Sequence, residues 1–326
     1  MSQSIECCFL IPPKSVDVWS GGFNWPDKLG AKAEESLLPL LDVCGMKWQS
    51  PTEADASIAL AVDPGVSGVD GYRLEVQEDG VAVTGAAPAA VFYGLQTLRE
   101  LRAVYGNELP ACRIKDSADF ARRGVYLDCS RGRVPTVDTL KQLIDRLAAW
   151  KVNELQLYIE NVFVFEKHPA IGEGFSPFSR DDIVEIQDYC RRRFIRLVGS
   201  LASCGHMETI LSLPEYKDLG ELAGWRGYPG GTTLCVTDPR AIALMADLYA
   251  EFIPVFDAED FNICGDEPWE LGQGRSRERA DEIGKGRLYA EFICKLHDLV
   301  AKKHGKRMNM WADVVIQHPE SLDHLP

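Results

Sequence analysis

The feature that most constrains the fold is a serial alternation of strands and helices that begins near Arg122. Short apolar runs alternate with segments whose apolar residues recur at helical spacing. The predicted strands cover residues 124–128, 154–159, 195–201, 260–265 and 307–311, and the predicted helices cover 137–150, 180–193, 239–256 and 287–304. Serial strand-helix units require a parallel sheet with right-handed crossovers, and the eight-stranded (β/α)8 barrel is the commonest closed form. We therefore predict an α/β fold of the TIM-barrel type.

Only about five strand-helix units are present, whereas a closed barrel of this type has eight. We therefore expect the chain to end part-way through the barrel. An open sheet of five strands would leave its first and last strands with unpaired edges, which favour aggregation.

Residues 1–118 have a different pattern, which predicts a small α+β domain ahead of a barrel domain at 119–326. Strands are expected at 9–13, 58–62, 72–76 and 81–84, and helices at 33–41 and 89–104. Glu78-Asp79-Gly80 between the last two strands is a hairpin turn signal. No cluster of residues in this domain is typical of a catalytic site.

Charge and composition exclude several classes of partner. The net charge of −14 argues against nucleic acid or an anionic membrane, because both attract basic proteins. The N-terminus has no basic segment followed by an apolar one, and no apolar run is long enough to span a bilayer. The ten cysteines form no C-x-x-C pair, which favours reduced core thiols over a disulfide framework. We therefore expect a cytoplasmic protein with a small or neutral ligand.

Polar residues follow each predicted barrel strand. The most distinctive are Asp266 and Glu267, which come after a buried strand and a glycine and are followed by a proline. The others are Asp128 and Arg131, Glu160 and Asn161, His206 and Glu208, and Trp311 and Asp313. An acidic turn or an isolated Arg131–Asp128 ion pair also fits any one of these alone. Because the carboxyl ends of barrel strands meet at one mouth, the whole set predicts a site there.

These motifs resemble family 20 of the glycoside hydrolases, the β-N-acetylhexosaminidases, over nearly the whole chain. The similarity lies in the segments Leu10–Lys14, Gly71–Leu74, Phe92–Leu98, Arg123–Asp128 with Arg131, Gly205-His206 and Gly265-Asp266-Glu267. The resemblance implies hydrolysis of β-linked terminal N-acetylhexosamine (GlcNAc or GalNAc) from small glycosides or oligosaccharides. The acetamido oxygen of the substrate would attack its own anomeric carbon, so the enzyme needs no nucleophile, cofactor or metal.

The resemblance also implies a role for each site residue. Glu267 would be the general acid and then the base, and Asp266 would hold the acetamido N–H. Arg131 would bind sugar hydroxyls, His206 would lie near Glu267, and Trp311 would form an apolar wall. Glu160, Asn161 and Asp313 would complete the substrate-binding set.

Two departures from the family pattern stand out. Glu160-Asn161 replaces a pair of acidic residues that is common after the second strand, and an amide carries no charge. A tyrosine and further tryptophans that the family supplies from later strands would lie beyond Pro326. The activity of this chain alone is therefore left open, as are the preferred epimer, the linkage and the oligomeric state.

Two other functions are left open. His206, Asp266, Glu267 and Asp313 could bind a divalent metal in the barrel mouth, although the set lacks a tight motif such as His-x-His. The chain could also be a sugar-binding or inactive relative, a hypothesis that the intact Asp266-Glu267 pair opposes.

Overall fold

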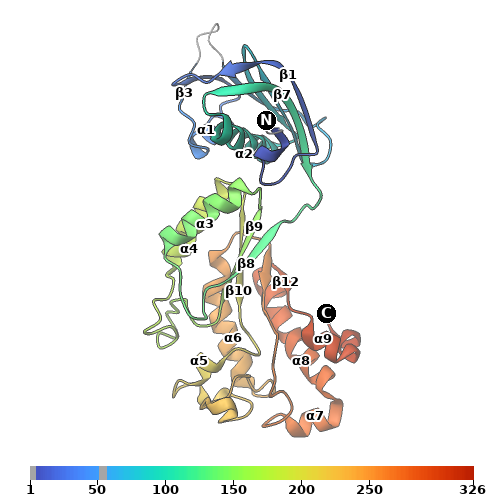
Figure 1. The fold of residues 1–326 in the computed structure, drawn as a ribbon. Helices are drawn as coiled ribbons and strands as arrows, with labels where there is room; N and C mark the ends of the chain where they lie inside the picture. Colours follow the sequence, from blue (N-terminus) through green and yellow to red (C-terminus); the bar gives the residue numbers. More distant parts are fainter. Residues whose placement is uncertain (1–4, 51–56) are drawn as a thin grey trace. The chain divides into compact units, whose positions relative to one another are not determined.

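The computed structural model describes residues 5–50 and 57–326, and the chain divides into two compact units. The first unit comprises the described residues of Met1–Gly124 together with Lys141–Asn153 and Tyr189–Ile195. The second comprises Val125–Leu140, Glu154–Asp188 and Arg196–Pro326. Figure 1 shows the strands of both units and the helices that accompany them.

The first unit is built on a mixed seven-stranded sheet in the order β1-β7-β5-β6-β4-β2-β3. Its elements in chain order are η1 (Ile5–Cys8), β1 (Ser15–Asn24), β2 (Leu29–Lys32), α1 (Pro39–Val43), β3 (Trp48–Gln49), β4 (Ile58–Val62), β5 (Val69–Gln77), β6 (Gly80–Gly85), α2 (Pro88–Tyr105) and β7 (Glu108–Ala118). Alternate residues of β6 are buried, as expected for a strand with one face on the core.

Helix α2 packs against this sheet through an almost continuous buried face. Phe92, Leu95 and Leu98 are fully buried, as their helical spacing predicts. The helix approaches β6 closely at Gly94, where a Cβ atom would lie 2.5 Å from a methyl group of Val83. The glycine therefore permits the contact between helix and sheet.

The second unit is a parallel five-stranded sheet whose order, β12-β11-β10-β9-β8, follows the chain sequence. The strands are β8 (Gly124–Asp128), β9 (Glu154–Ile159), β10 (Arg196–Leu201), β11 (Asp260–Asn262) and β12 (Arg307–Asn309). Neighbouring strands that are also consecutive in the chain are the arrangement of a (β/α)8 barrel. The sheet is a partial barrel, because five of eight strand positions are present among the described residues.

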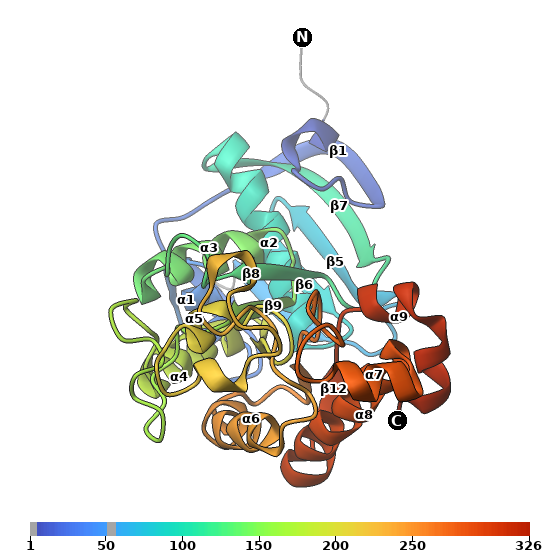
Figure 2. The ribbon, with the colours of Figure 1, turned by 90° about the horizontal axis from the view of Figure 1, so that it is seen from below.

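Helices and short turns lie between these strands in the chain and follow the last of them. They are α3 (Val137–Ala149), α4 (Arg180–Arg191), α5 (Glu208–Leu211), α6 (Pro239–Phe252), α7 (Arg277–Ile283), α8 (Lys285–His297), a π-helix at Asp298–Lys303 and α9 (Asp313–Gln317), with 3-10 turns at Lys217–Leu219, Trp225–Gly227, Ile253–Val255 and Pro319–His324. Figure 2 shows α6 and α8 next to each other on the outside of the strands. Tyr249 and Phe252 of α6 meet Phe261 of β11 edge-on, with ring centroids 5.2 and 6.1 Å apart, and so anchor the helix to the sheet.

Charged side chains at the start of the barrel strands form a second, ionic anchor. Asp260 of β11 is buried and lies 2.9 Å from a guanidinium nitrogen of Arg196 in β10 and 2.5 Å from Nε of Arg307 in β12. Arg196 also pairs with buried Glu154 of β9. The cluster therefore links four adjacent strands.

The structure corrects several predictions for the first unit. Residues 9–13 form no strand, and the first strand begins at Ser15. The predicted helix at 33–41 is only the short α1, which begins at Pro39 because proline suits the first turn of a helix but not its interior. The pattern also missed β1, β2, β3 and β7. In the barrel, the helix expected at 287–304 is divided between α8 and the π-helix.

Nine cysteines among the described residues are free thiols, and seven of them are buried. This confirms the expectation of core thiols for Cys44, Cys112, Cys129, Cys190, Cys204, Cys235 and Cys264; Cys7 lies outside the described side chains. In the part of the chain that the structure describes, no helix has the length and apolar character needed to cross a membrane.

Candidate active site

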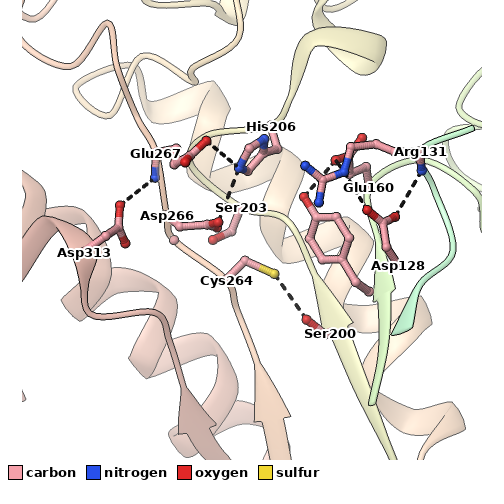
Figure 3. Close-up of polar contacts among 12 residues, drawn as sticks. Asp128, Arg131, Glu160, Ser200, Ser203, His206, Cys264, Asp266, Glu267 and Asp313 are labelled. Atoms are coloured by element: carbon pink, nitrogen blue, oxygen red, sulfur yellow. Dashed lines mark hydrogen bonds and ion pairs between the residues drawn. The ribbon is translucent and has the colours of Figure 1, made fainter. Parts of the chain in front are cut away.

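The carboxyl ends of the five parallel strands bring most of the predicted residues together (Figure 3). Figure 3 shows His206 between the Asp266-Glu267 segment on one side and Arg131 and Glu160 on the other. Asp313 approaches the Asp266-Glu267 segment from the far side. This arrangement agrees with the prediction that polar residues from the ends of all five strands lie close together.

A sharply turned loop after β11 presents Asp266 and Glu267. Cys264, Gly265 and Glu267 have φ angles of 59°, 76° and 48°, in the left-handed region that non-glycine residues rarely adopt. The hydroxyl of Tyr289 donates a hydrogen bond to the carbonyl of Gly265 at 2.9 Å and fixes the turn. Residues held in such conformations are concentrated at functional sites, because the surrounding structure must stabilise the strain.

His206 lies within reach of both carboxylates of this loop. Its Nε2 is 3.3 Å from Oδ2 of Asp266 and 3.5 Å from Oε2 of Glu267. The hydrogen bond to Asp266 raises the pKa of His206 above its usual value, although partial burial opposes this. Gly205 permits the approach, because a Cβ there would lie 2.3 Å from the backbone oxygen of Asp266.

Asp313 holds the backbone of the same loop. Its Oδ2 accepts a hydrogen bond from the backbone N–H of Glu267 at 3.0 Å. The side chain of Glu267 itself is 46% exposed, so its carboxyl remains open to a ligand. Asp313 therefore fixes the position of Glu267 without occupying its carboxyl group.

A second cluster surrounds Arg131. Its Nε lies 2.6 Å from Oδ2 of Asp128 and 3.8 Å from Oε1 of Glu160. Burial works against ionisation of Asp128, but hydrogen bonds from the backbone of Arg131 and Ser130 and from the guanidinium keep its pKa below the usual value. Burial raises the pKa of Glu160, even though the hydroxyl of Tyr158 donates to its Oε1 at 2.8 Å.

Aromatic rings form the wall between the two clusters. Tyr126 meets Trp311 edge-on at a centroid distance of 5.2 Å, and Trp311 is 41% exposed. Tyr158 packs 5.8 Å from Tyr126 and 6.4 Å from the His206 ring. The sequence reading missed both tyrosines. They could have been predicted, because residues two positions apart in a strand lie on the same face. Tyr126 and Tyr158 each stand two positions before a carboxylate at the end of a strand, Asp128 and Glu160.

Within the part of the chain that the structure describes, Asn161 and Glu208 make no hydrogen bond or ion pair to the side chains of these clusters. Both line a neighbouring pocket, and Asn161 is almost fully buried. Glu208 is close enough to raise the pKa values of both Glu160 and His206 through its charge.

The geometry gives the metal hypothesis no support. Across residues 5–50 and 57–326, no group of three or more His, Cys, Asp and Glu side chains is arranged to hold a metal ion.

Two family models match the chain. The model for "Glycosyl hydrolase family 20, catalytic domain" matches residues 120–324, and the model for "Glycosyl hydrolase family 20, domain 2" matches residues 13–117. A β-hexosaminidase of Porphyromonas gingivalis is 26% identical over 94% of this chain and 45% of its own length. A β-N-acetylhexosaminidase of Cellulomonas fimi is 34% identical over 62% of this chain and 44% of its own length.

Solved structures share the fold. The chitobiase of Flavobacterium johnsoniae superposes with a TM-score of 0.77 at 23% identity, over 93% of this chain and 52% of that one. An exo β-N-acetylglucosaminidase of Vibrio harveyi superposes with a TM-score of 0.80 at 19% identity, over 95% and 55% of the two chains. The chain thus spans about half the length of these relatives.

Proposed function

Because the chain belongs to glycosyl hydrolase family 20, we propose that the protein removes terminal β-linked N-acetylhexosamine from glycosides, by substrate-assisted catalysis with retention of configuration. The observation that carries this proposal is the pairing of Asp266 and Glu267 at the end of β11, with His206 within 3.5 Å of both. The names of several relatives, such as β-hexosaminidase, support it.

In this mechanism Glu267 transfers the proton. It protonates the glycosidic oxygen as the bond to the anomeric carbon breaks, and the acetamido oxygen of the sugar forms the new bond to that carbon. Glu267 then removes a proton from the water that opens the resulting oxazolinium ring. The exposed carboxyl and the backbone hydrogen bond to Asp313 support this role, because the group is both accessible and held in place.

Asp266 orients the acetamido group. Its Oδ2 faces His206, whereas its Oδ1 has no hydrogen-bond partner among the residues that the structure describes. An unpaired carboxylate oxygen is suited to accept the acetamido N–H and to offset the positive charge that develops on the oxazolinium ring.

Three other predicted residues, Arg131, Glu160 and Trp311, bind the sugar. Arg131, fixed by Asp128 and Glu160, offers guanidinium donors to ring hydroxyls, and the carboxylate of Glu160 accepts from them. Trp311 with Tyr126 supplies an apolar surface for the acetamido methyl group or the ring.

Two further proposals follow from the sequence. We place the boundary between the α+β domain and the barrel domain at residues 118 and 119, which the two matched ranges support. A cytoplasmic location also stays a proposal, for which fractionation of the cells that make the protein is the test.

The test of function uses the full-length protein and a chromogenic aryl β-N-acetylhexosaminide, followed by optical assay and by NMR of the released sugar. We expect turnover and a first product of β configuration. An α product would contradict the retaining mechanism. Binding of N-acetylglucosamine without any turnover would instead indicate a sugar-binding relative.

A further inference from the structure

A pocket of about 370 Å³ lies wholly within the first unit and shares no residue with the candidate active site. Strands β1, β7 and β5, which are neighbours in the sheet (Figure 2), contribute to its lining, and so does the loop between β4 and β5. Gly68 allows this loop to approach β7, because a Cβ atom there would lie 2.5 Å from the Cβ of Ser117. The volume is within the range of about 300–1,000 Å³ that is typical of small-molecule sites.

Two cations of the pocket stand directly opposite each other in the sheet. Lys115 of β7 is in register with Arg73 of β5 on one side and with Ser15 of β1 on the other. Leu74 and Ile114, the chain neighbours of these two cations, are fully buried, so Arg73 and Lys115 point to the other face of the sheet. The Cβ atoms of directly opposite residues are about 4.5–5.5 Å apart, and like charges at such positions destabilise a sheet.

The neighbouring row of residues on the same face has the stabilising arrangement. Arg113 of β7 stands opposite Glu75 of β5, and its Nε lies 2.6 Å from Oε1 of Glu75. Each of these residues is two positions from Lys115 or Arg73 along its own strand. Opposite charges therefore pair in one row, whereas the next row brings two cations together. An unfavourable pair of this kind is accounted for if the two cations bind an anion.

Neither cation of the pair is neutralised by a close acidic side chain. Lys115 is exposed, and its ammonium group makes no hydrogen bond or ion pair within residues 5–50 and 57–326. The guanidinium of Arg73 lies 3.9 Å from Oδ2 of Asp63, and these two side chains are 41% and 53% exposed. An exposed ion pair at this distance contributes little to stability. Both cations are therefore available to a ligand.

Further hydrogen-bond donors line the same pocket. Lys14 donates to Oγ of Ser117 at 3.1 Å, and its acidic partner at 2.8 Å, Asp119, is 76% exposed. The hydroxyl-bearing residues Ser15 and Ser67 complete this set of donors.

The acidic residues of the pocket only partly offset its positive charge. Asp116 is already paired, because Lys151 lies 3.1 Å from its Oδ2 and the hydroxyl of Tyr72 donates to the same oxygen at 2.9 Å. The lining then holds three cations against the single carboxylate of Asp63. A local excess of positive charge is distinctive in a chain whose net charge is −14.

We propose that this pocket binds a small molecule through a sulfate or phosphate group. Ammonium, guanidinium and hydroxyl groups all donate hydrogen bonds to such an oxyanion, and the charged donors form the stronger bonds. The donors come from three strands and a loop, which suits a tetrahedral oxyanion better than a planar carboxylate. The site is independent of the reaction proposed above and gives the first unit a binding function of its own.

The test measures binding by calorimetry on the full chain, with inorganic sulfate, inorganic phosphate and glucose 6-phosphate as probes. Sodium chloride keeps the ionic strength constant, because exposed charges are screened by salt. Lys115→Gln and Arg73→Gln should each weaken binding about tenfold or more, since each removes a charge-assisted hydrogen bond. Lys28→Gln is the matched control: Lys28 is exposed in the same unit but does not line the pocket, so binding should be unchanged.

A second measurement tests the like-charge pair itself. In low-salt buffer without the anion, Lys115→Gln should raise the melting temperature by about 1–3 °C, because it removes the repulsion of Arg73. Sulfate stabilises most proteins through its exclusion from their surfaces. The site-specific effect is therefore the additional rise that sulfate causes in the unmodified protein and in Lys28→Gln but not in Lys115→Gln.

The outcomes either support or overturn the site. Tenfold tighter binding of glucose 6-phosphate than of inorganic phosphate would support a phosphorylated or sulfated molecule as the ligand. Equal affinities that Lys115→Gln abolishes would support the free ion as the ligand of the same site. No binding of any probe at millimolar concentration would overturn the inference and leave Lys115 and Arg73 as solvated surface charges. Binding that both variants retain would also overturn it, and so would a lower melting temperature of Lys115→Gln.

Discussion

Oδ2 of Asp313 accepts a hydrogen bond from the backbone N–H of Glu267 at 3.0 Å, although the two residues are 46 positions apart in the chain. The contact joins the loop after β11 to the first residue of α9, and it fixes the backbone of Glu267, whose φ is 48°. Asp313 is therefore a positioning residue for the proposed general acid, because it acts through Glu267 and leaves the carboxyl of Glu267 free.

Asp313→Ala should lower kcat about 10- to 100-fold, since a hydrogen bond to a charged group contributes about 1.5–3 kcal/mol. KM for an aryl substrate should change little. Asp313→Asn should restore much of the rate, because the amide oxygen can still accept from the N–H. Equal rates for the two variants in a steady-state assay would show that the hydrogen bond does not position Glu267.

Glu267→Gln should lower kcat about 10²- to 10⁴-fold, because an amide cannot supply the proton that the leaving oxygen needs. Binding of N-acetylglucosamine, measured by calorimetry, should persist, since the amide is nearly the same size. Glu278→Gln on the exposed face of α7 is the control and should leave the rate unchanged. A Glu267→Gln protein with normal turnover would exclude this residue as the proton donor.

Asp266→Asn should lower kcat about 10²- to 10³-fold, the usual effect of removing one group that stabilises charge in the transition state. The loss should be as large for a good leaving group as for a poor one, because Asp266 assists the acetamido attack and not the departure. Asp281→Asn is the control, because Asp281 is exposed, and it should leave the rate unchanged. A loss confined to poor leaving groups would contradict the assignment.

The His206–Asp266 pair predicts a pH-dependent stability. The pKa of His206 is raised in the folded state, so its contribution is fully present below the unfolded value of about 6.5. The contribution is lost as the pH rises through the raised folded value. The difference in melting temperature between the unmodified protein and Asp266→Asn should therefore be larger at pH 5.5 than at pH 8.5. The pKa of His206, followed by NMR, should fall in the variant, and an unchanged titration would contradict the pairing.

Arg196→Met should destabilise the fold by about 3 kcal/mol, because it leaves the buried carboxylates of Glu154 and Asp260 with fewer cationic partners. Urea denaturation measures the effect. Arg277→Met is the control: that side chain is 72% exposed and lies 3.9 Å from Asp281, so the change should stay within about 0.5 kcal/mol. A decrease in the free energy of unfolding no greater than that of the control would show that the ionic cluster around Arg196 does not stabilise the fold.

The strongly periodic parts of the fold were predictable from sequence. The predicted barrel strands 154–159 and 124–128 are present with these bounds. The helix predicted at 239–256 is present as α6 and ends at Phe252, where a 3-10 turn begins. The edge strands of the first unit were not predictable, because β1 is largely exposed and contains two adjacent glycines, so it has no clear alternation. Tertiary pairing with β7 makes it a strand.

The site residues that lie at the ends of predicted strands could be predicted from the sequence. Asp266, Glu267, His206 and Arg131 could all be found by collecting those ends. Other relationships required coordinates. Glu160 contacts Arg131 whereas the next residue, Asn161, lines a neighbouring pocket, and the sequence does not predict which way each side chain points. The left-handed backbone conformation of Glu267 is also not predictable from the residue type.

Cys264 stands at the entrance to the turn that carries Asp266 and Glu267. Burial raises the pKa of its thiol to about 12, and Oγ of Ser200 lies 3.2 Å from the sulfur. An alkylating reagent needs both access and a thiolate. The rate at which such a reagent alkylates Cys264 should therefore measure how often the loop opens transiently. The probe is a native sulfur atom that has no role in the proposed reaction.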